Sequence, residues 1–428
     1  MKALEITGPQ RVCGELTLAG NKNAALPMIA AALLTDEPVV LRNVPDILDV
    51  RNMLAIAAQL GVRCDFDGHT ATLDASGLNT SSPDEKLCAA LRTSILFAGP
   101  LAARTGHACI AHPGGDVIGR RRLDTHFYGL AKLGISAVYD GSRYTFSSNA
   151  RRQGAELFLD EASVTATEHI LTVAATAGGT TIIRNAACEP HVTQLAQLLN
   201  KMGARISGVE TNLLVVEGVR KLHGADFTIG ADHVNAASFL SLAAATQGKI
   251  DLYGEIAPHD YWMTRRVFQR LGANILLEPG HLRLEQNRPL QVENDLDGIM
   301  PTISDGPWPQ FPSDMMSCLI TMATQTQGSV LFFEKMFESR IYFVDRLIAM
   351  GANAVVCDPH RAIVAGPSRL HGAELISPDI RAGMALIIAA CCAHGTSRIR
   401  NADMVYRGYT DLPDRLRQLS LEIKELEL

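Results

Sequence analysis

The chain has few of the features that mark specialised protein classes. Aromatic residues make up only 5 % of its 428 residues, charged residues 20 %, and the formal net charge is −6. A negative balance argues against a general nucleic-acid-binding protein, which presents a basic surface. No apolar run approaches the roughly 20 residues that a membrane-spanning helix needs. With 47 % hydrophobic residues, the composition is that of a folded globular protein, and the length predicts two domains.

Cysteine motifs are missing as well. The chain has nine cysteines, but no Cys-x-x-Cys pair and no cysteine–histidine spacing that suits zinc. Their odd number argues against a disulfide framework, and most lie in apolar surroundings. We therefore expect reduced core thiols in a cytoplasmic protein without a metal site. The N-terminal residues 1–6 resemble the start of a strand rather than a signal peptide.

What the sequence does contain is an internal repeat. A helix-like stretch ends in an apolar residue plus glycine or serine, and a short β-like run follows it; the pattern recurs at intervals of roughly 70–80 residues. The six ends are Leu60-Gly61, Leu133-Gly134, Met202-Gly203, Leu271-Gly272, Met350-Gly351 and, more weakly, Leu419-Ser420. A glycine at this place closes the helix and lets the chain turn into the next strand.

A second, alanine-rich helix is predicted in each repeat. The six ranges are residues 23–34, 87–103, 163–177, 232–246, 314–326 and 379–393. Small residues nearly all round these helices indicate burial. Four of them start at residues that favour the N-cap position, namely Ser163, Asp232, Asp314 and Asp379. The six units predict an α/β protein of two domains, residues 22–230 and residues 1–21 with 231–428.

Two segments of the first domain carry side chains suited to an anionic ligand. Lys22 and Asn23 stand at the start of a predicted buried helix, but taken alone the segment is more simply explained as an ordinary cap with an exposed lysine. Residues 112–124 combine proline, three glycines and Asp116 with consecutive arginines at 120–122. Guanidinium groups match phosphate and carboxylate oxygens, so this segment predicts a mobile anion-binding loop; a solvated turn is the alternative. It contains no Gly-Lys-Ser/Thr phosphate-loop pattern.

Two further segments belong to the second domain. Asp314, in Phe-Pro-Ser-Asp, is interpreted either as an N-cap or as a base that reaches a ligand. Arg381 and Arg407 stand at the ends of predicted elements, where single arginines are usually surface residues. From the residues alone, both interpretations of each position stay open.

Taken together, seven motifs resemble the enolpyruvyl transferase family, the family of EPSP synthase, over essentially the whole chain. They are Lys22-Asn-Ala-Ala-Leu-Pro27, Leu91-Arg-Thr-Ser-Ile95, Pro113-Gly-Gly-Asp-Val-Ile-Gly119, Phe311-Pro-Ser-Asp-Met315, Phe337-Glu-Ser-Arg340, Pro378-Asp-Ile-Arg381 and Arg407-Gly-Tyr409. The resemblance is to the branch that acts on a sugar nucleotide. It implies two inside-out α/β barrel domains, each of three βαβαββ units around buried helices, with the active site in the cleft between them.

The resemblance also implies a reaction. The enolpyruvyl group of phosphoenolpyruvate would pass to the 3-hydroxyl of UDP-N-acetylglucosamine with release of phosphate, the first committed step of peptidoglycan precursor synthesis. It implies no cofactor, metal, nucleic acid or membrane, and leaves a homo-oligomer open. The alternatives are an enolpyruvyl transferase acting on a different nucleotide or on shikimate 3-phosphate, and a non-catalytic paralogue that binds UDP-sugars.

The family motifs assign roles to individual residues. The catalytic residues implied are Lys22, Asp116 as the acid, Asp314 as the base, and Arg407. Those implied to bind phosphoenolpyruvate are Lys22, Asn23, Arg92, Arg121, Asp379, Arg381 and Arg407. Those implied to bind UDP-N-acetylglucosamine are Asn23, Arg92, Arg121, Arg122, Leu123, Asp124, Thr125, Ser163, Val164, Thr165, Asp314 and Met336.

The sequence departs from the commonest family pattern at four positions. Asp116 replaces the usual loop cysteine, a variant also found in some members. Arg122 replaces a proline, Glu161 a lysine and Thr165 a glycine. The last three lie at the expected nucleotide end, so they bear on the choice of acceptor more than on the phosphoenolpyruvate half.

Overall fold

The computed structural model describes residues 2–114 and 122–427. These residues form two compact units. One, here called the middle unit, comprises described residues of 20–230; the other, the terminal unit, comprises residues 2–19 and 231–427. Asp116 and Arg121 lie outside the described residues.

The middle unit contains three small sheets. The first has the order β13 (Ala225–Thr228), β3 (Val39–Arg42), β5 (Thr70–Asp74), β4 (Arg63–Asp67). The second has the order β11 (Arg205–Ser207), β12 (Leu213–Glu217), β10 (Thr180–Arg184), β9 (Glu156–Phe158). The third has the order β6 (His107–Ala111), β8 (Arg143–Ser148), β7 (Ile135–Tyr139).

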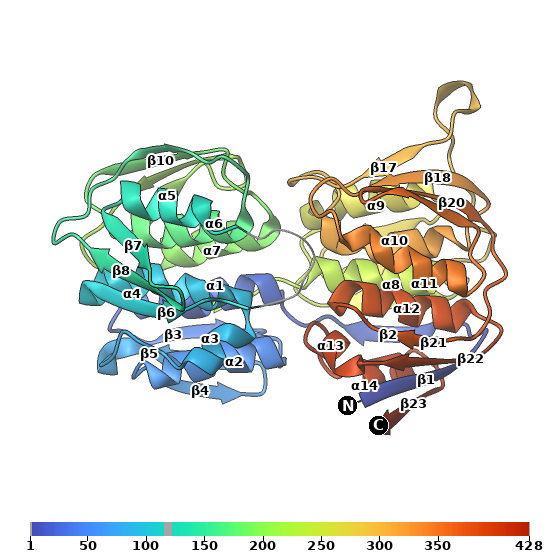
Figure 1. The fold of residues 1–428 in the computed structure, drawn as a ribbon, viewed down its shortest axis with the longest axis horizontal. Helices are drawn as coiled ribbons and strands as arrows, with labels where there is room; N and C mark the ends of the chain where they lie inside the picture. The colour runs from blue at the N-terminus through green and yellow to red at the C-terminus, as the bar shows by residue number, and fades with distance from the viewer. Residues whose placement is uncertain (1, 115–121, 428) are drawn as a thin grey trace. The chain divides into compact units, whose positions relative to one another are not determined.

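The terminal unit contains three sheets of four strands. The first has the order β21 (Glu374–Ile376), β22 (Gly395–Arg400), β1 (Lys2–Gly8), β23 (Ile423–Glu427), so the first and last strands of the chain pair with each other (Figure 1). The second has the order β15 (Ile275–Glu278), β16 (His281–Glu285), β14 (Lys249–Tyr253), β2 (Cys13–Thr17). The third has the order β17 (Thr302–Ser304), β18 (Gly328–Phe333), β20 (Arg361–Gly366), β19 (Ala354–Asp358).

The predicted repeat is confirmed in the sheets. Each four-stranded sheet has one parallel pair at an edge, followed by two antiparallel pairs. The sheet β6-β8-β7 is wholly antiparallel and has no fourth strand among the described residues. The expectation of about four strands in every unit is therefore wrong for the second repeat.

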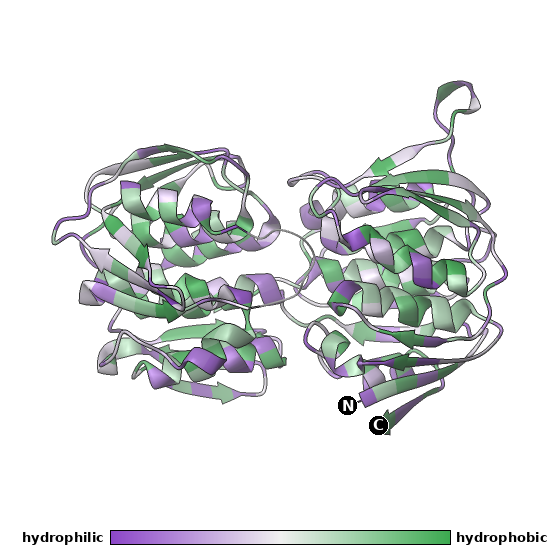
Figure 2. Ribbon diagram, viewed as in Figure 1, coloured by the Kyte–Doolittle hydropathy of each residue, from purple (hydrophilic) through white to green (hydrophobic). Residues whose placement is uncertain are grey.

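The predicted alanine-rich helices form the core of each unit. In the terminal unit they are α8 (His233–Ala245), α10 (Ser313–Ala323) and α12 (Ile380–Cys392), and Figure 2 shows all three as mainly hydrophobic. In the middle unit they are α1 (Lys22–Ala31), α4 (Ala98–Thr105) and α6 (Val164–Ala174). Helix α8 is buried along its whole length, which explains its lack of a polar face.

Other helices follow the strands. In the middle unit these are α2 (Leu48–Gln59), α3 (Glu85–Ala90), α5 (Asp124–Lys132) and α7 (Pro190–Lys201). In the terminal unit they are α9 (Trp262–Arg270), α11 (Val344–Ala349), α13 (Ala402–Tyr406) and α14 (Leu412–Gln418). Short 3₁₀ turns include η1 (Ala32–Leu34), η3 (Arg92–Phe97) and η6 (Arg340–Phe343).

The predicted helix over residues 87–103 is wrong, because the chain breaks at Leu91. Leu91 is extended, with φ −146° and ψ 145°, and α3, η3 and α4 are separate elements. The hydroxyl of Ser94 donates to the carbonyl oxygens of Cys88, at 2.8 Å, and Leu91, at 2.9 Å. It thereby satisfies carbonyl groups that a continuous helix would satisfy with backbone N–H groups. Pro100 lies in the first turn of α4, where its missing N–H costs nothing.

The six helix ends predicted from the repeat are confirmed by their backbone. The five glycines have φ between 81° and 98°, and Ser420, at the sixth end, has φ 65°. This is the left-handed region, which costs a residue with a side chain roughly 1–2 kcal/mol. Ser420, at the sixth end, therefore adopts a strained left-handed backbone conformation, whereas glycine adopts this conformation without strain at the other five ends.

Replacing Gly134 by alanine is expected to lower the free energy of unfolding by ~1–2 kcal/mol, measured by urea titration. A side chain there would meet only the flexible end of Asn149, so the backbone term dominates. Ser420→Ala is the matched control, since residue 420 is already left-handed and loses only an exposed hydrogen bond to Cys13. Equal losses in the two variants would contradict this explanation.

The cysteines agree only partly with the expectation. All nine are free, and Cys88, Cys318 and Cys391 are buried. Cys13 and Cys357 are exposed at strands β2 and β19, so their assignment to the core is wrong. Among the described helices, none is long and apolar enough to cross a membrane.

Candidate functional site

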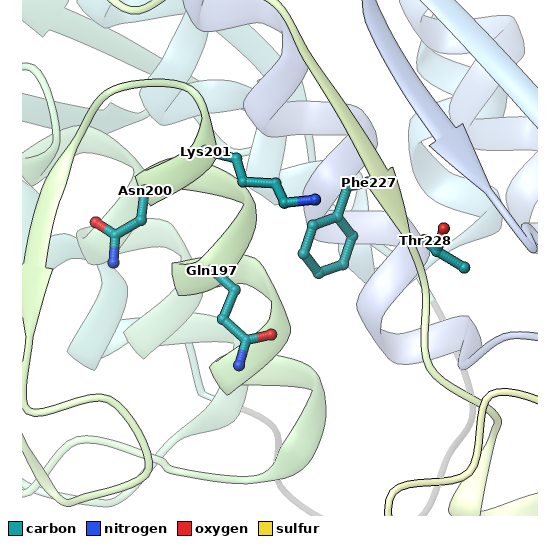
Figure 3. A pocket seen from close by; sticks show the side chains of 5 residues that line it. All are labelled: Gln197, Asn200, Lys201, Phe227 and Thr228. Carbon is teal, nitrogen blue, oxygen red and sulfur yellow. The ribbon is translucent and has the colours of Figure 1, made fainter. Parts of the chain in front are cut away.

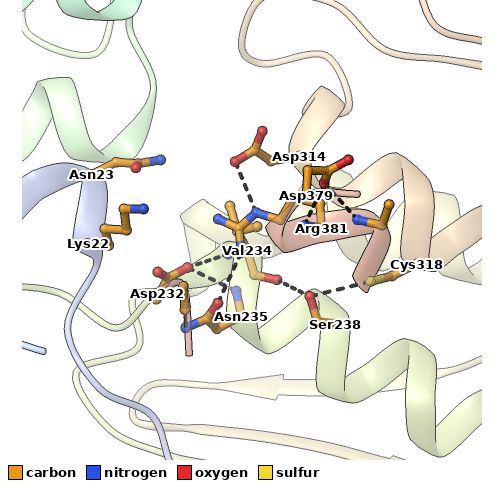
Figure 4. A network of polar contacts seen from close by, with 12 residues as sticks. Lys22, Asn23, Asp232, Val234, Asn235, Ser238, Asp314, Cys318, Asp379 and Arg381 are labelled. Carbon is orange, nitrogen blue, oxygen red and sulfur yellow. Dashed lines mark hydrogen bonds and ion pairs between the residues drawn. The ribbon is translucent and has the colours of Figure 1, made fainter. Parts of the chain in front are cut away.

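The N-terminal ends of the three core helices of the terminal unit bring polar side chains together (Figure 4). Asn235 comes from α8, Asp314 from α10 and Arg381 from α12. Arg381 Nε donates to Asp314 Oδ2 at 3.2 Å, and Arg381 Nη1 donates to Asn235 Oδ1 at 3.3 Å. Each of the three repeat copies in the terminal unit therefore places one polar side chain in this cluster.

Asp314 has a second arginine partner. Arg340, in η6, donates from Nη1 to Asp314 Oδ1 at 2.7 Å, and only 5 % of the Arg340 side chain is exposed. Burial alone would raise the pKa of Asp314, but the guanidinium groups of Arg340 and Arg381 offset it and hold this pKa well below its usual range. The carboxylate is therefore ionised throughout the physiological pH range. One third of its side chain, 33 %, is still exposed and open to a ligand.

The interpretation of Asp314 as an N-cap is wrong. Helix α10 begins at Ser313, and its N-cap is Pro312, so Asp314 lies inside the first turn and caps no backbone N–H group. The other three predicted N-caps are confirmed. The side chains of Ser163, Asp232 and Asp379 accept hydrogen bonds from backbone N–H groups of α6, α8 and α12.

A buried carboxyl group, which sequence reasoning missed, contacts the residue that precedes Asp314. Glu334 follows β18, is fully buried, and accepts a hydrogen bond from the Ser313 hydroxyl at 2.7 Å. Burial and the neighbouring Asp305 raise the pKa of Glu334 to about 9. Asp305 in turn accepts the backbone N–H group of Met336 at 3.3 Å. An acidic residue directly after the apolar run Val330-Leu-Phe-Phe333 was the only sequence signal.

The remaining predicted residues of the terminal unit lie on separate elements. Asp379 is the N-cap of α12, where its Oδ1 accepts the N–H groups of Arg381 and Ala382. Arg407 is the residue that ends α13 and contacts Met404. Met336 is exposed in the turn after β18. The geometry brings Asp379 next to Arg381.

The middle unit holds a second charged pair. Lys22 is the first residue of α1, and its Nζ lies 2.6 Å from Asp49 Oδ2 in the first turn of α2. Only 13 % and 6 % of the two side chains are exposed. Asn21 is buried and caps α1 through the N–H group of Asn23. The alternative of an exposed lysine is therefore wrong, and Asp49 is a partner that sequence reasoning missed.

Replacing Asp49 by asparagine is expected to lower the free energy of unfolding by ~3 kcal/mol, because it removes the buried carboxylate that pairs with the ammonium group of Lys22. Asp46→Asn is the matched control. Asp46 pairs with Arg51 at 2.6 Å, but 61 % of that arginine side chain is exposed, so the loss there should stay below ~1 kcal/mol. Urea unfolding of the three proteins measures both values, and similar losses would contradict the burial argument.

The residues predicted at the nucleotide end lie around the starts of η3 and α5. Arg92 begins η3, and its Nη2 donates to the carbonyl oxygen of Arg122 at 3.0 Å. Arg122 is exposed and pairs with Asp124 at 3.5 Å, in the first turn of α5. Leu123 and Thr125 are buried. The Thr125 hydroxyl donates to Glu161 at 3.4 Å, which places this departure from the family pattern beside α5.

Three further predicted residues begin α6. Ser163 is the N-cap, and Val164 and Thr165 are the first two helical residues. Their side chains are partly exposed. The first N–H groups of a helix have no partner within it, and together with the helix dipole they favour an anion.

Other features of the described residues do not coincide with these clusters. An open pocket on the middle unit is lined by Gln197, Asn200, Lys201, Phe227 and Thr228, none of which was predicted (Figure 3). Over the same described ranges, no three histidine, cysteine, aspartate or glutamate side chains are grouped to hold a metal ion.

Comparison with known proteins identifies the family. The model of EPSP synthase (3-phosphoshikimate 1-carboxyvinyltransferase) matches residues 6–416. The chain belongs to the EPSP synthase family of enolpyruvyl transferases.

Curated relatives extend over the whole chain. The UDP-N-acetylglucosamine 1-carboxyvinyltransferase of Treponema denticola is 50 % identical over 420 residues and covers 98 % of both chains. Those of Treponema pallidum and Bradyrhizobium diazoefficiens are 49 % and 46 % identical, and cover 99 % and 98 % of this chain. The two Treponema and Bradyrhizobium proteins thus share one name and close to half of their residues with this chain.

Solved structures support the fold. The enolpyruvyl transferase NikO from Streptomyces tendae superposes with a TM-score of 0.89 at 23 % identity, over 99 % of this chain and 98 % of that one. EPSP synthase from Acinetobacter baumannii gives a TM-score of 0.78 at 18 % identity over both whole chains. The predicted α/β fold of six repeated units is confirmed as the enolpyruvyl transferase fold, with six small sheets.

Proposed function

We propose that this transferase moves the enolpyruvyl group of phosphoenolpyruvate to the 3-hydroxyl of UDP-N-acetylglucosamine and releases phosphate, which is the first committed step of peptidoglycan precursor synthesis. The relatives that are 46–50 % identical over nearly the whole chain carry this support. The single structural observation behind the chemistry is the ionised Asp314, held between Arg340 and Arg381 yet partly exposed. Both charged clusters would serve this one reaction: the cluster around Asp314 in the second predicted domain and the pair of Lys22 and Asp49 in the first.

Phosphoenolpyruvate bears a phosphate and a carboxylate, so its binding requires several cations. We assign this task to Lys22, Arg92, Arg121, Arg381 and Arg407, with Asn23 and Asp379 beside them. The buried pairing of Lys22 with Asp49 holds its ammonium group in place before the substrate arrives. Fixed charges in a desolvated site stabilise developing charge more than mobile ones do, because no reorganisation is needed.

The acceptor hydroxyl must lose its proton as its oxygen attacks C2 of phosphoenolpyruvate. Asp314 is assigned as the base, and Asp116, in the loop outside the described residues, as the acid that gives a proton to the methylene carbon. The two arginines keep Asp314 ionised, so the carboxylate is able to accept this proton, which finally leaves with the phosphate. The enolpyruvyl ether forms when the methyl group returns its proton and the C–O bond to phosphate breaks.

The nucleotide end is assigned to the middle unit. Residues Arg121, Arg122, Leu123, Asp124 and Thr125 would border the base, and the N-terminus of α6, at residues 163–165, would meet the diphosphate. Met336 and Asp314 of the terminal unit would contact the sugar. The nine free thiols suit a cytoplasmic enzyme, where such groups stay reduced.

The family name leaves shikimate 3-phosphate as the rival acceptor. Phosphate release from phosphoenolpyruvate, measured with each acceptor in turn, separates the two. We expect release with UDP-N-acetylglucosamine and none above background with shikimate 3-phosphate. The reverse result would replace the proposed acceptor, and release with neither would favour the non-catalytic paralogue.

A further inference from the structure

Two histidines lie buried behind the N-terminus of α6 and have no role in the proposed chemistry. His169 comes from α6 itself and His126 from α5, and their rings meet edge to face at 5.3 Å between centroids. Both are almost completely buried. Hydrogen bonds join the backbone of α4 to His169, His169 to His126, and His126 to the hydroxyl of Thr165. Once the donor of the first bond is known, the donor and acceptor of each later bond follow.

The first bond begins at the backbone of Gly99, whose N–H group can only donate. It lies 2.7 Å from His169 Nε2, so this nitrogen accepts and carries no hydrogen. Gly99 is needed for the approach, since a side chain there would come within 2.6 Å of the His169 ring. Burial lowers the pKa of His169 to about 3, so the ring is neutral and its hydrogen is on Nδ1.

The position of the hydrogen on His169 determines the tautomer of His126. His169 Nδ1 lies 3.1 Å from His126 Nδ1, and because the first nitrogen carries the hydrogen, the second must accept. Burial, His169 and Arg92 hold the pKa of His126 well below its usual value, so this ring is neutral too. Its hydrogen is therefore on Nε2, which lies 3.1 Å from the Thr165 hydroxyl oxygen and donates to it.

Thr165 is left with a hydroxyl hydrogen that must find another acceptor. Within residues 2–114 and 122–427, the structure shows no acceptor for it. The side chain is partly exposed beside the first backbone N–H groups of α6. Because the hydroxyl oxygen already accepts the hydrogen bond from His126, its own hydrogen can be donated to a ligand. The oxygens of a diphosphate are hydrogen-bond acceptors, so they match this donor.

We propose that the relay from Gly99 through His169 and His126 fixes Thr165 as a hydrogen-bond donor to the diphosphate of the nucleotide substrate. The inference rests on the proposed function, because it takes the acceptor substrate to be a nucleoside-diphosphate sugar. Thr165 replaces the glycine of the commonest family pattern, and the relay explains what the added hydroxyl group could do at this position. His169 and His126 are positioning residues, since they act through Thr165.

Calorimetric binding of UDP and of uridine to the full chain tests the contact. Thr165→Val keeps the shape but removes the hydroxyl, so it should weaken UDP binding about tenfold or more, as expected for a hydrogen bond to a charged group. Uridine, which lacks the diphosphate, should bind the variant and the parent alike. Thr165→Ser, which keeps the hydroxyl, should stay within about twofold of the parent.

The relay itself is tested by a double-mutant cycle. His169→Phe should weaken UDP binding in the parent but cause no further loss in the Thr165→Val background. A purely structural His169 would give equal losses in both backgrounds, which would overturn the inference. Nitrogen NMR of the histidines in the parent protein tests the relay without any variant. We expect the hydrogen on Nδ1 of His169 and on Nε2 of His126.

Hydrogen on Nδ1 of His126 would overturn the relay. Unchanged UDP binding by Thr165→Val, in a parent that binds UDP, would overturn the inference alone. A parent that is folded but binds no UDP would overturn both the inference and the proposed acceptor.

Discussion

Replacing Asp314 by asparagine is expected to lower turnover by ~10²-fold or more while the chain stays folded. Asparagine keeps the size of the side chain and one oxygen that can accept a hydrogen bond from Arg340 or Arg381, but it cannot take a proton from the acceptor hydroxyl. Both variants remove the counter-ion of two buried guanidinium groups, which is expected to lower the free energy of unfolding by ~3–5 kcal/mol. Alanine is the poorer test, because it also leaves these groups without any acceptor oxygen. Turnover is measured as phosphate release per folded molecule.

Asp345→Asn is the matched control for this experiment. Asp345 lies in the first turn of α11 in the same unit, but it is exposed and outside both charged clusters. Its substitution should leave turnover unchanged. If Asp314→Asn kept the turnover of the parent with an unchanged fold, Asp314 would have a structural role in neutralising its two arginines and no part in proton transfer.

The second large effect concerns fosfomycin, an epoxide that resembles phosphoenolpyruvate in charge and inactivates family members by alkylating the loop cysteine. Asp116 replaces that cysteine here. A carboxylate is far less nucleophilic toward an epoxide than a thiolate, but a carboxyl group still donates a proton. We expect an active enzyme that resists fosfomycin, and Asp116→Cys should restore inactivation that grows with time.

Two cysteines of the middle unit, Cys88 and Cys188, do not offer the inhibitor an easy target. Burial raises the pKa of Cys88 to about 12 and that of Cys188 to about 11, so both stay protonated at neutral pH. Intact-mass measurement after incubation with fosfomycin decides the matter. A covalent adduct on the parent, with activity lost in step, would show that the assignment of Asp116 is wrong.

The repeat was predictable from sequence because its signals are local. A helix that must end and turn into a strand needs a left-handed residue, and glycine at five of the six ends marks this need. The break at Leu91 was missed because residues 87–103 are apolar and small, which also suits one long helix. Its cause is the pair of side-chain hydrogen bonds of Ser94, which do not show in a hydrophobic pattern.

The site was predictable only where a motif carried the residue. Asp314 and Arg381 were found through their motifs, whereas Asp49, Glu334 and the two histidines make contacts across 21 or more positions of the chain. No local pattern marks such pairs. Arg340 illustrates the limit, since its motif was recognised but its bond to Asp314 appears only when η6 packs against α10.

The identity of the product tests the proposed function most directly. The direct measurement is the mass of the compound formed when the enzyme is incubated with phosphoenolpyruvate and UDP-N-acetylglucosamine, with phosphate release followed in parallel. The account predicts UDP-N-acetylglucosamine carrying one enolpyruvyl group, formed in equal amount to the phosphate released. Phosphate release with an unchanged sugar nucleotide, or an enolpyruvyl group on a different acceptor only, would contradict it.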